Sequence, residues 1–232
     1  MMNVLAIIPA RGGSKGIPNK NIKELSGKPL LQYTSEVALA SKKISKVILS
    51  SDADQIIKVG KELGLEVPFK RPSELAQDNT PTLPVIQHAI SYFQKKGEFF
   101  DAVCILQTTT PFRTVEFIDN AIDVFERNNA DSLISVLEIP HEFNPHWAFI
   151  EHKEGQLSIA TGDQEIIPRR QDLPKAYHRD GSIYITKTKV VMNNHSLFGK
   201  SISFVKSSPA TYVNIDTSED WLKAENLVKE IQ

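Results

Sequence analysis

Glycines and basic side chains alternate near the amino terminus, in segment 8–21 (IPARGGSKGIPNKN). The glycines permit tight turns and leave backbone N–H groups able to point at phosphate oxygens. Three basic side chains, Arg11, Lys15 and Lys20, can neutralise a triphosphate and stabilise phosphate groups as they leave. Ser14 adds a hydroxyl donor. The segment therefore predicts phosphate chemistry.

Two better-known phosphate motifs do not fit this segment. A P-loop needs a second glycine five positions after the first, and Ile17 stands at that distance from Gly12. No three glycines here have the spacing of the dinucleotide fingerprint. We therefore expect a phosphate-binding loop of a third kind. The alternative is a basic surface turn whose glycines serve flexibility alone.

Two further polar segments follow expected strands, at 70–78 (KRPSELAQD) and 105–113 (ILQTTTPFR). The guanidinium of Arg71 suits a phosphate, and the side-chain amide of Gln107 can donate and accept as sugar or base recognition requires. Arg113 is expected to be structural, closing its turn onto the next helix.

The first 140 residues alternate strand-like runs with helical periodicity. Strands are expected at 4–8, 46–50, 66–69, 102–106 and 132–138, and helices at 30–40, 54–63, 83–95 and 115–128. This order predicts an α/β fold with a doubly wound, mostly parallel sheet. Ligands bind such sheets beyond the carboxyl ends of the strands, so the loops at Pro9, Phe69 and Gln107 should form the site.

The pattern changes between Pro140 and Pro174, where a hairpin or arm is expected with its turn at Glu154-Gly155. Strands should resume at 182–186 and 201–205. A final helix is expected over 218–231, capped by Thr217, Ser218 and Asp220. From the residues alone, the aromatic side chains of the arm could pack inside one subunit or against another.

The composition of the 232 residues limits the classes of function. The formal net charge is −1, with 41% hydrophobic and 24% charged residues, so no general electrostatic case exists for nucleic-acid or membrane-surface partners. No run approaches the length of a membrane span, and no basic segment precedes the first apolar run, so we expect a cytoplasmic protein. Cys104 is the only cysteine; we expect a buried, inert thiol.

The glycine-rich segment closely resembles the signature of CMP-sialic acid synthetases (acylneuraminate cytidylyltransferases), which have a Rossmann-like nucleotidyltransferase fold. The similarity continues at 71–78, 106–113, 170–174 (RQDLP), 180–184 (DGSIY) and 213–217 (VNIDT). It implies activation of a nine-carbon 2-keto-3-deoxy sugar acid by CTP, with release of pyrophosphate. The implied catalytic residues are Arg11, Lys15 and Asp216. The implied nucleotide-binding residues are Ala10, Arg11, Gly12, Gly13, Ser14, Lys15, Lys20, Asn21, Arg71 and Thr82, although Thr82 could equally cap a helix.

The resemblance also implies a metal and a second subunit. Asp216 would hold Mg²⁺ near the α-phosphate, and Asn214 stands where the family has a second carboxylate, so it offers only a neutral oxygen. Helix capping is the alternative role for Asp216. Residues 1–232 are expected to form a single domain. The arm at about 140–174 resembles the part of the family's proteins that crosses to a second subunit, which implies a homodimer.

Gln107, Arg170 and His178 are the implied sugar contacts. Because His178 stands about where the family often has an arginine, and because 144–147 also departs from the family, legionaminic or pseudaminic acid remain open beside sialic acid. Asp180 replaces a frequent asparagine.

Two other functions remain as alternatives. A synthetase for the eight-carbon acid Kdo would carry a Ser-x-Arg-x-Pro-Gly-Lys pattern, which 14–19 (SKGIPN) does not match. A catalytically silent nucleotide-binding subunit would bind CTP without turnover, and Asn214 is the only feature that favours it.

Overall fold

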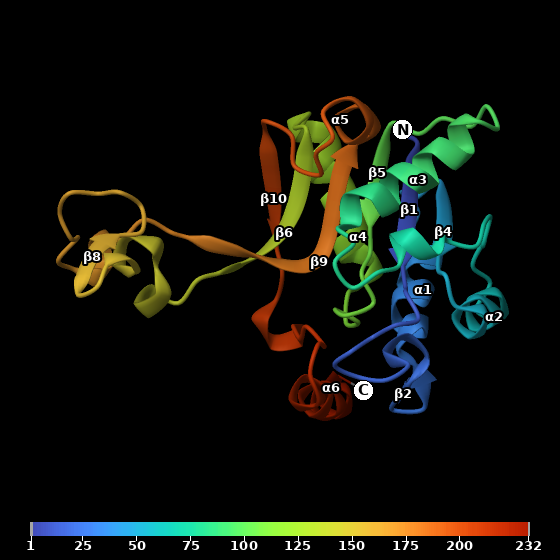
Figure 1. The fold of residues 1–232 in the computed structure, drawn as a ribbon, viewed down its shortest axis with the longest axis horizontal. Coiled ribbons are helices and arrows are strands. Elements are labelled where there is room, and N and C mark those ends of the chain that lie inside the picture. The colour runs from blue at the N-terminus through green and yellow to red at the C-terminus, as the bar shows by residue number, and fades with distance from the viewer. Residues whose placement is uncertain (1, 232) are drawn as a thin grey trace.

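A six-stranded sheet forms the centre of the computed structural model, which describes residues 2–231 (Figure 1). The strand order is β10-β6-β9-β5-β1-β4, and only β9 runs antiparallel to its neighbours. The strands are β1 (Val4–Pro9), β4 (Lys46–Ser50), β5 (Ala102–Ile105), β6 (Ser132–Glu138), β9 (Tyr177–Lys187) and β10 (Ile202–Lys206). The expected α/β fold with a mostly parallel sheet is confirmed.

Helices cover both faces of this sheet because its central strands are apolar on both sides. Alternate residues of β1 enter different cores: Ala6 packs in the cluster that includes α1, α2 and α4, and Ile7 in the cluster that includes α3 and α5. The helices are α1 (Leu30–Ala40), α2 (Asp54–Glu62), α3 (Thr82–Gln94), α4 (Val115–Asn128), α5 (Thr188–Asn193) and α6 (Ser218–Ile231). No helix within residues 2–231 has the length and apolarity needed to cross a membrane.

A third apolar cluster attaches α6 to the amino-terminal loop. Ile17 from that loop and Trp221 from α6 are both buried in it, together with Leu25 of the small hairpin of β2 (Glu24–Leu25) and β3 (Lys28–Pro29). This packing fixes the start of α6 beside the glycine-rich segment, although more than 190 positions separate them in the chain.

One expected strand is wrong. Segment 66–69 forms no strand: isolated bridges join Glu66 to Ile48 of β4, and Lys70 to Ser51 just after β4. Pro68 lies between these bridges and has no N–H to donate, so a continuous ladder cannot form. The helix expected at 83–95 is present one residue earlier, and the short α5, β2 and β3 were not expected.

The arm projects from the sheet and is linked to it by β6 and β9 (Figure 1). Its hairpin pairs β7 (Phe149–Lys153) with β8 (Gln156–Ile159), and Gly155 in the turn has a φ of 75°, which confirms the predicted turn. The remaining arm elements are short 3-10 helices, η3 (His141–Phe143), η4 (Pro145–Trp147) and η5 (Arg170–Asp172). Trp147 is held inside the arm, where its Nε1 donates to the Ile167 carbonyl at 2.7 Å.

Candidate active site

A cavity of about 570 Å³ lies beyond the carboxyl ends of β1 and β5. Its lining draws on all three loops where the sequence predicted a site, through Pro9, Arg71 and Gln107. The other predicted residues that line it are Arg11, Ser14, Lys20, Asn21, Thr82, Asn214 and Asp216. Segments far apart in the chain therefore meet in one cavity, as the strand order requires.

The backbone of the glycine-rich loop is only partly available for a ligand. The Gly12 N–H donates to Asp52 Oδ1 at 3.0 Å, and the Ser14 N–H donates to the Gly12 carbonyl at 3.1 Å. Within residues 2–231, the N–H groups of Gly13, Lys15 and Gly16 have no protein acceptor. The expectation that the loop glycines leave their N–H groups free holds for Gly13 and Gly16 and is wrong for Gly12. Ala10 contributes to the core, since its side chain is buried.

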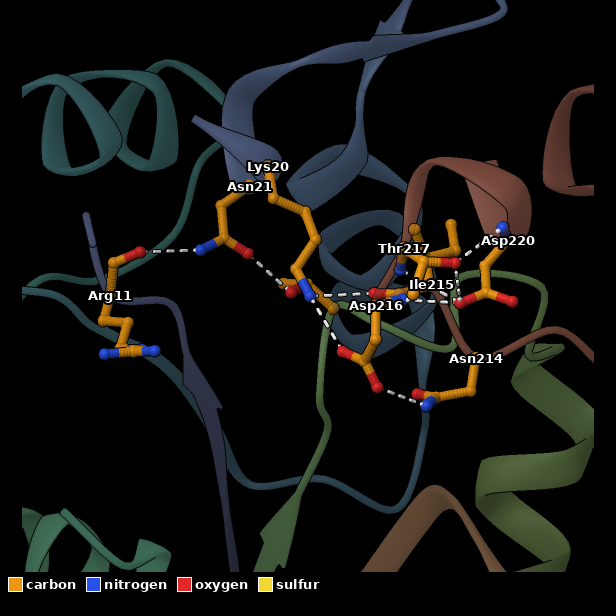
Figure 2. Close-up of polar contacts among 9 residues, drawn as sticks. Arg11, Lys20, Asn21, Asn214, Ile215, Asp216, Thr217 and Asp220 are labelled. Carbon is orange, nitrogen blue, oxygen red and sulfur yellow. Dashed lines mark hydrogen bonds and ion pairs between the residues drawn. The ribbon is translucent and has the colours of Figure 1, made fainter. Parts of the chain in front are cut away.

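Lys20 and Asp216 form an ion pair on one wall of the cavity (Figure 2). Lys20 Nζ, at the start of η1 (Lys20–Ile22), donates to Asp216 Oδ1 at 3.0 Å and to the Ile215 carbonyl at 2.8 Å. Asn214 Nδ2 donates to the other Asp216 oxygen at 2.7 Å. The side-chain oxygen of Asn214 takes no part in that hydrogen bond.

A capping box at the start of α6 orients Asp216. Asp220 Oδ2 accepts the Thr217 N–H at 3.0 Å and the Asp216 N–H at 3.2 Å, and Thr217 Oγ1 accepts the Asp220 N–H at 3.2 Å. A hydrogen bond from the Thr217 side chain lowers the pKa of Asp220. Helix capping is therefore performed by Thr217 and Asp220, and the Asp216 side chain faces the cavity.

Two residues predicted to bind the nucleotide, Asn21 and Arg71, form hydrogen bonds within the protein. Asn21 Nδ2 donates to the Arg11 carbonyl at 2.9 Å, and Asn21 Oδ1 accepts from Thr108 Oγ1 at 2.6 Å, so Asn21 braces the glycine-rich loop against the β5 loop. Arg71 is buried and donates from Nε to Ser50 Oγ at 3.0 Å; burial lowers the pKa of Arg71 to about 10. Thr82 begins α3 and lines the cavity.

The side chains of Arg11 and Lys15 pair with Asp78 and take no part in the Lys20–Asp216 ion pair. Figure 2 shows Arg11 well separated from Lys20 and Asp216. Both Arg11 and Lys15 contact the carboxylate of Asp78, each at 2.6 Å, and hydrogen bonds from Lys15 and Arg11 hold the pKa of Asp78 below its usual range. Lys15 lines a smaller flanking cleft of about 380 Å³ and does not line the main cavity.

A second set of residues that line the cavity carries polar groups suited to a polar substrate. These residues are Gln107, Arg179, Asp180, Tyr184 and Tyr212. Burial raises the pKa of Tyr184, and the positive charge of Arg179 opposes that rise. These side chains can accept and donate hydrogen bonds, and they carry one cation, Arg179, and one carboxylate, Asp180.

Two predicted sugar contacts do not reach this cavity. Arg170 lies in η5 of the arm and His178 at the start of β9, and both side chains are exposed. The sequence interpretation missed Arg179, the neighbour of His178, because strand residues alternate between faces and the register of β6 with β9 shifts between Ile134 and Val136.

Arg113 lies outside the main cavity and holds the loop that carries Gln107, which confirms its predicted structural role. Its two terminal nitrogens donate to the carbonyls of Gln107 (2.7 Å) and Ser182 (2.8 Å) and to the hydroxyls of Thr34 (2.6 Å) and Thr110 (2.7 Å). Burial lowers the pKa of Arg113 to about 10. The guanidinium thereby joins α1, the β5 loop and β9.

The carboxylates of the cavity suit a metal ion that is bound partly by water and substrate phosphates better than one that is bound by protein groups alone. Among residues 2–231, no group of three or more His, Cys, Asp or Glu side chains could hold a metal ion. Mg²⁺ commonly takes one or two carboxylates and completes its shell with water and substrate phosphates. Asp216, with 60% of its side chain exposed and the neutral Asn214 oxygen beside it, suits that mode.

Comparisons with known proteins show the family of this chain. The family model described as "Cytidylyltransferase" matches residues 5–231. A pseudaminic acid cytidylyltransferase of Campylobacter jejuni is 36% identical over 98% of this chain and 97% of its own length. A CMP-N,N'-diacetyllegionaminic acid synthase of Legionella pneumophila is 33% identical over the same shares. An N-acylneuraminate cytidylyltransferase A of Danio rerio is 32% identical over 97% of this chain, which spans 51% of that longer protein.

The fold has a solved counterpart. A CMP:2-keto-3-deoxy-manno-octonic acid synthetase complexed with CTP superposes with a TM-score of 0.73, over 99% of this chain and 100% of the other, at 16% identity. At that identity the likeness concerns the fold alone.

Proposed function

Since this chain belongs to the cytidylyltransferase family, as an enzyme of the acylneuraminate cytidylyltransferase type, we propose that it transfers CMP from CTP to a nine-carbon 2-keto-3-deoxy sugar acid and releases pyrophosphate. The residues that line the main cavity and the flanking cleft carry this proposal. Arg11 and Lys20 in the cavity and the open N–H groups of Gly13 and Lys15 at the flanking cleft suit phosphates, and Arg179 and Gln107 in the cavity suit a polar acid.

In the proposed reaction, the anomeric hydroxyl of the sugar acid attacks the α-phosphorus of CTP. The new bond joins that oxygen to phosphorus, and the bond from the α-phosphorus to the bridging oxygen breaks, so pyrophosphate leaves with the bonding electrons. Arg11, Lys15 and Lys20 stabilise the charge on the leaving group. The hydroxyl proton passes to Asp216 or to water. No covalent enzyme intermediate is needed.

Mg²⁺ is the proposed metal, held by Asp216 with Asn214 as a neutral neighbour. When bound, it would lower the negative charge on the phosphates that opposes attack. The protein's own part is to hold Asp216 in place through the capping box, and to provide Lys20 as the group paired with it.

The sugar is proposed to be a sialic, legionaminic or pseudaminic acid, since relatives with two of these names and an acylneuraminate enzyme all match most of the chain. We further propose a homodimer in the cytoplasm, with residues 1–232 as one domain and 140–174 as its dimerisation arm. Exposed apolar side chains on the arm, Phe143, Phe149, Ile150, Leu157 and Ile166, support that role. In such a dimer, the arm of a second copy would bring Arg170 to a sugar site, and His178 would lie in β9, the strand that links that arm to its sheet.

Pyrophosphate release tests the proposal. CTP and Mg²⁺ are incubated with N-acetylneuraminic, legionaminic, pseudaminic and Kdo acids in turn, with EDTA as the metal-free control. We expect release with one nine-carbon acid, loss of release in EDTA, and loss of most turnover in folded Lys15→Ala and Asp216→Ala variants. Release with Kdo alone would favour the eight-carbon alternative, and CTP binding without any release would favour the silent subunit.

A further inference from the structure

Asp78 bridges two cations of the glycine-rich loop. It lies between η2 (Ser73–Leu75) and α3, and its Oδ1 is 2.6 Å from an Arg11 terminal nitrogen while its Oδ2 is 2.6 Å from Lys15 Nζ. Each carboxylate oxygen thus takes one cation. Two oxygens of one phosphate group would satisfy the same pair of cations in the same way.

The loop that carries Asp78 makes few hydrogen bonds to other parts of the protein. Its own bonds are local: the Thr80 N–H donates to the Gln77 carbonyl at 3.1 Å, and Gln77 Nε2 donates to the Ser73 carbonyl at 2.7 Å. Arg11 also reaches the Ala76 carbonyl, at the long distance of 3.5 Å. The bridge through Asp78 is therefore its main polar tie to the glycine-rich loop.

The bridge stands where two cavities meet. The main cavity and the flanking cleft are both lined by Arg11, Ser14, Gln77 and Asp78. The Lys15 and Asp78 side chains are 78% and 43% exposed. Ion pairs this exposed are weak, so another anion that reaches the loop can replace the carboxylate.

We propose that Asp78 is a built-in competitor for the phosphate groups that bind Arg11 and Lys15. It holds both cations in place, gives them up when a triphosphate binds, and pairs with them again as pyrophosphate leaves. The inference rests on the proposed function, because Arg11 and Lys15 must be phosphate ligands for the competition to matter.

The charge of Asp78 can be removed without changing its size. In Asp78→Asn, inorganic triphosphate should bind about 3- to 10-fold more tightly than in the wild type, since two exposed ion pairs no longer have to be broken. Inhibition of turnover by added pyrophosphate should strengthen by a similar factor. A purely structural role for Asp78 predicts the opposite sign, because loss of the bridge would then disorder the phosphate ligands.

Titration calorimetry with inorganic triphosphate measures this effect on the full chain. Asp123→Asn is the matched control: it removes the same charge and breaks a 2.6 Å ion pair with Lys43, on a part of α4 outside both cavities. It should bind within about twofold of the wild type. Asp78→Glu, which keeps the charge, should stay closer to the wild type than Asp78→Asn.

The outcomes separate the two proposals. Tighter binding by Asp78→Asn alone supports the competitor. Equal or weaker binding by a folded Asp78→Asn, in a wild type that releases pyrophosphate from CTP and a sugar acid, overturns the competitor and leaves the proposed function intact. A wild type that releases pyrophosphate from CTP and a sugar acid but binds no triphosphate overturns the competitor alone, and one that does neither overturns both.

Discussion

Gly16 lets the phosphate loop approach the segment that carries Asp216. A Cβ built on Gly16 would lie 2.1 Å from the Asp216 carbonyl oxygen, which is a backbone atom and cannot rotate away. Gly16→Ala must therefore separate the two segments by roughly 1 Å to reach an ordinary contact. The bonds from Lys20 Nζ to the Ile215 carbonyl (2.8 Å) and to Asp216 (3.0 Å) cross this boundary and would be lost or distorted.

A displacement of about 1 Å in a reacting site can cost about 100-fold in rate. We expect kcat/KM for Gly16→Ala to fall by about that factor, equivalent to about 2.7 kcal/mol, measured as pyrophosphate release from CTP and the sugar acid. Crowding should lower the free energy of unfolding by about 1–3 kcal/mol, so the variant should still fold. Urea unfolding provides that check.

Gly13→Ala is the comparison variant on the same loop. A Cβ there meets no heavy atom within 4 Å, and Gly13 lines the flanking cleft only. Its loss should stay below about tenfold. The reasoning is refuted if a folded Gly16→Ala keeps wild-type kcat/KM, or if the two glycine variants lose the same amount, since close approach would then not be the cause.

Three further predictions concern Arg179 in the cavity and the buried side chains of Arg113 and Cys104. Arg179→Ala should raise KM for the sugar acid by about 10- to 100-fold, the worth of a charged hydrogen bond, with KM for CTP unchanged in steady-state kinetics; an equal rise in both would argue against a sugar contact. Arg113→Met should lower the free energy of unfolding by about 3–5 kcal/mol in urea, because Gln107 and three other buried groups lose their donor, and Arg113→Lys should not rescue it; a loss below about 1 kcal/mol would contradict this. Burial raises the pKa of Cys104 to about 12, so the thiol stays protonated at pH 8 and should react with a disulfide reagent only after unfolding, as followed by absorbance; rapid reaction of the folded protein would show that the thiol is accessible.

The secondary structure was predictable wherever burial alone decides it. The helices at 30–40 and 115–128 and the strand at 132–138 have the bounds expected from their apolar pattern. The pattern failed at Pro68, where the apolar residues on either side favour a strand but the missing N–H prevents the ladder. It also gave no sign of α5, which has six residues and is too short for helical periodicity to be recognised.

The site was predictable in its chemistry and less so in its contacts. The loops at the strand ends were expected, because strand order alone brings them together. The choice between His178 and Arg179 depends on a register shift in the pairing of β6 with β9, which no local pattern encodes. The pairing of Asp78 with Arg11 spans 67 positions and follows only from the folded arrangement.

The ion pairs of the glycine-rich loop keep its charge balanced within a chain of net charge −1. Arg11 and Lys15 share Asp78, and Lys20 is paired with Asp216, so each basic side chain of the loop has a carboxylate beside it. Unpaired cations at this density would repel one another and attract unspecific polyanions. A triphosphate that arrives with Mg²⁺ brings an anion for Arg11 and Lys15 and a cation for Asp216. The proposed exchange therefore conserves local charge balance, and a polyphosphate without the metal can replace Asp78 but has nothing to offer Asp216.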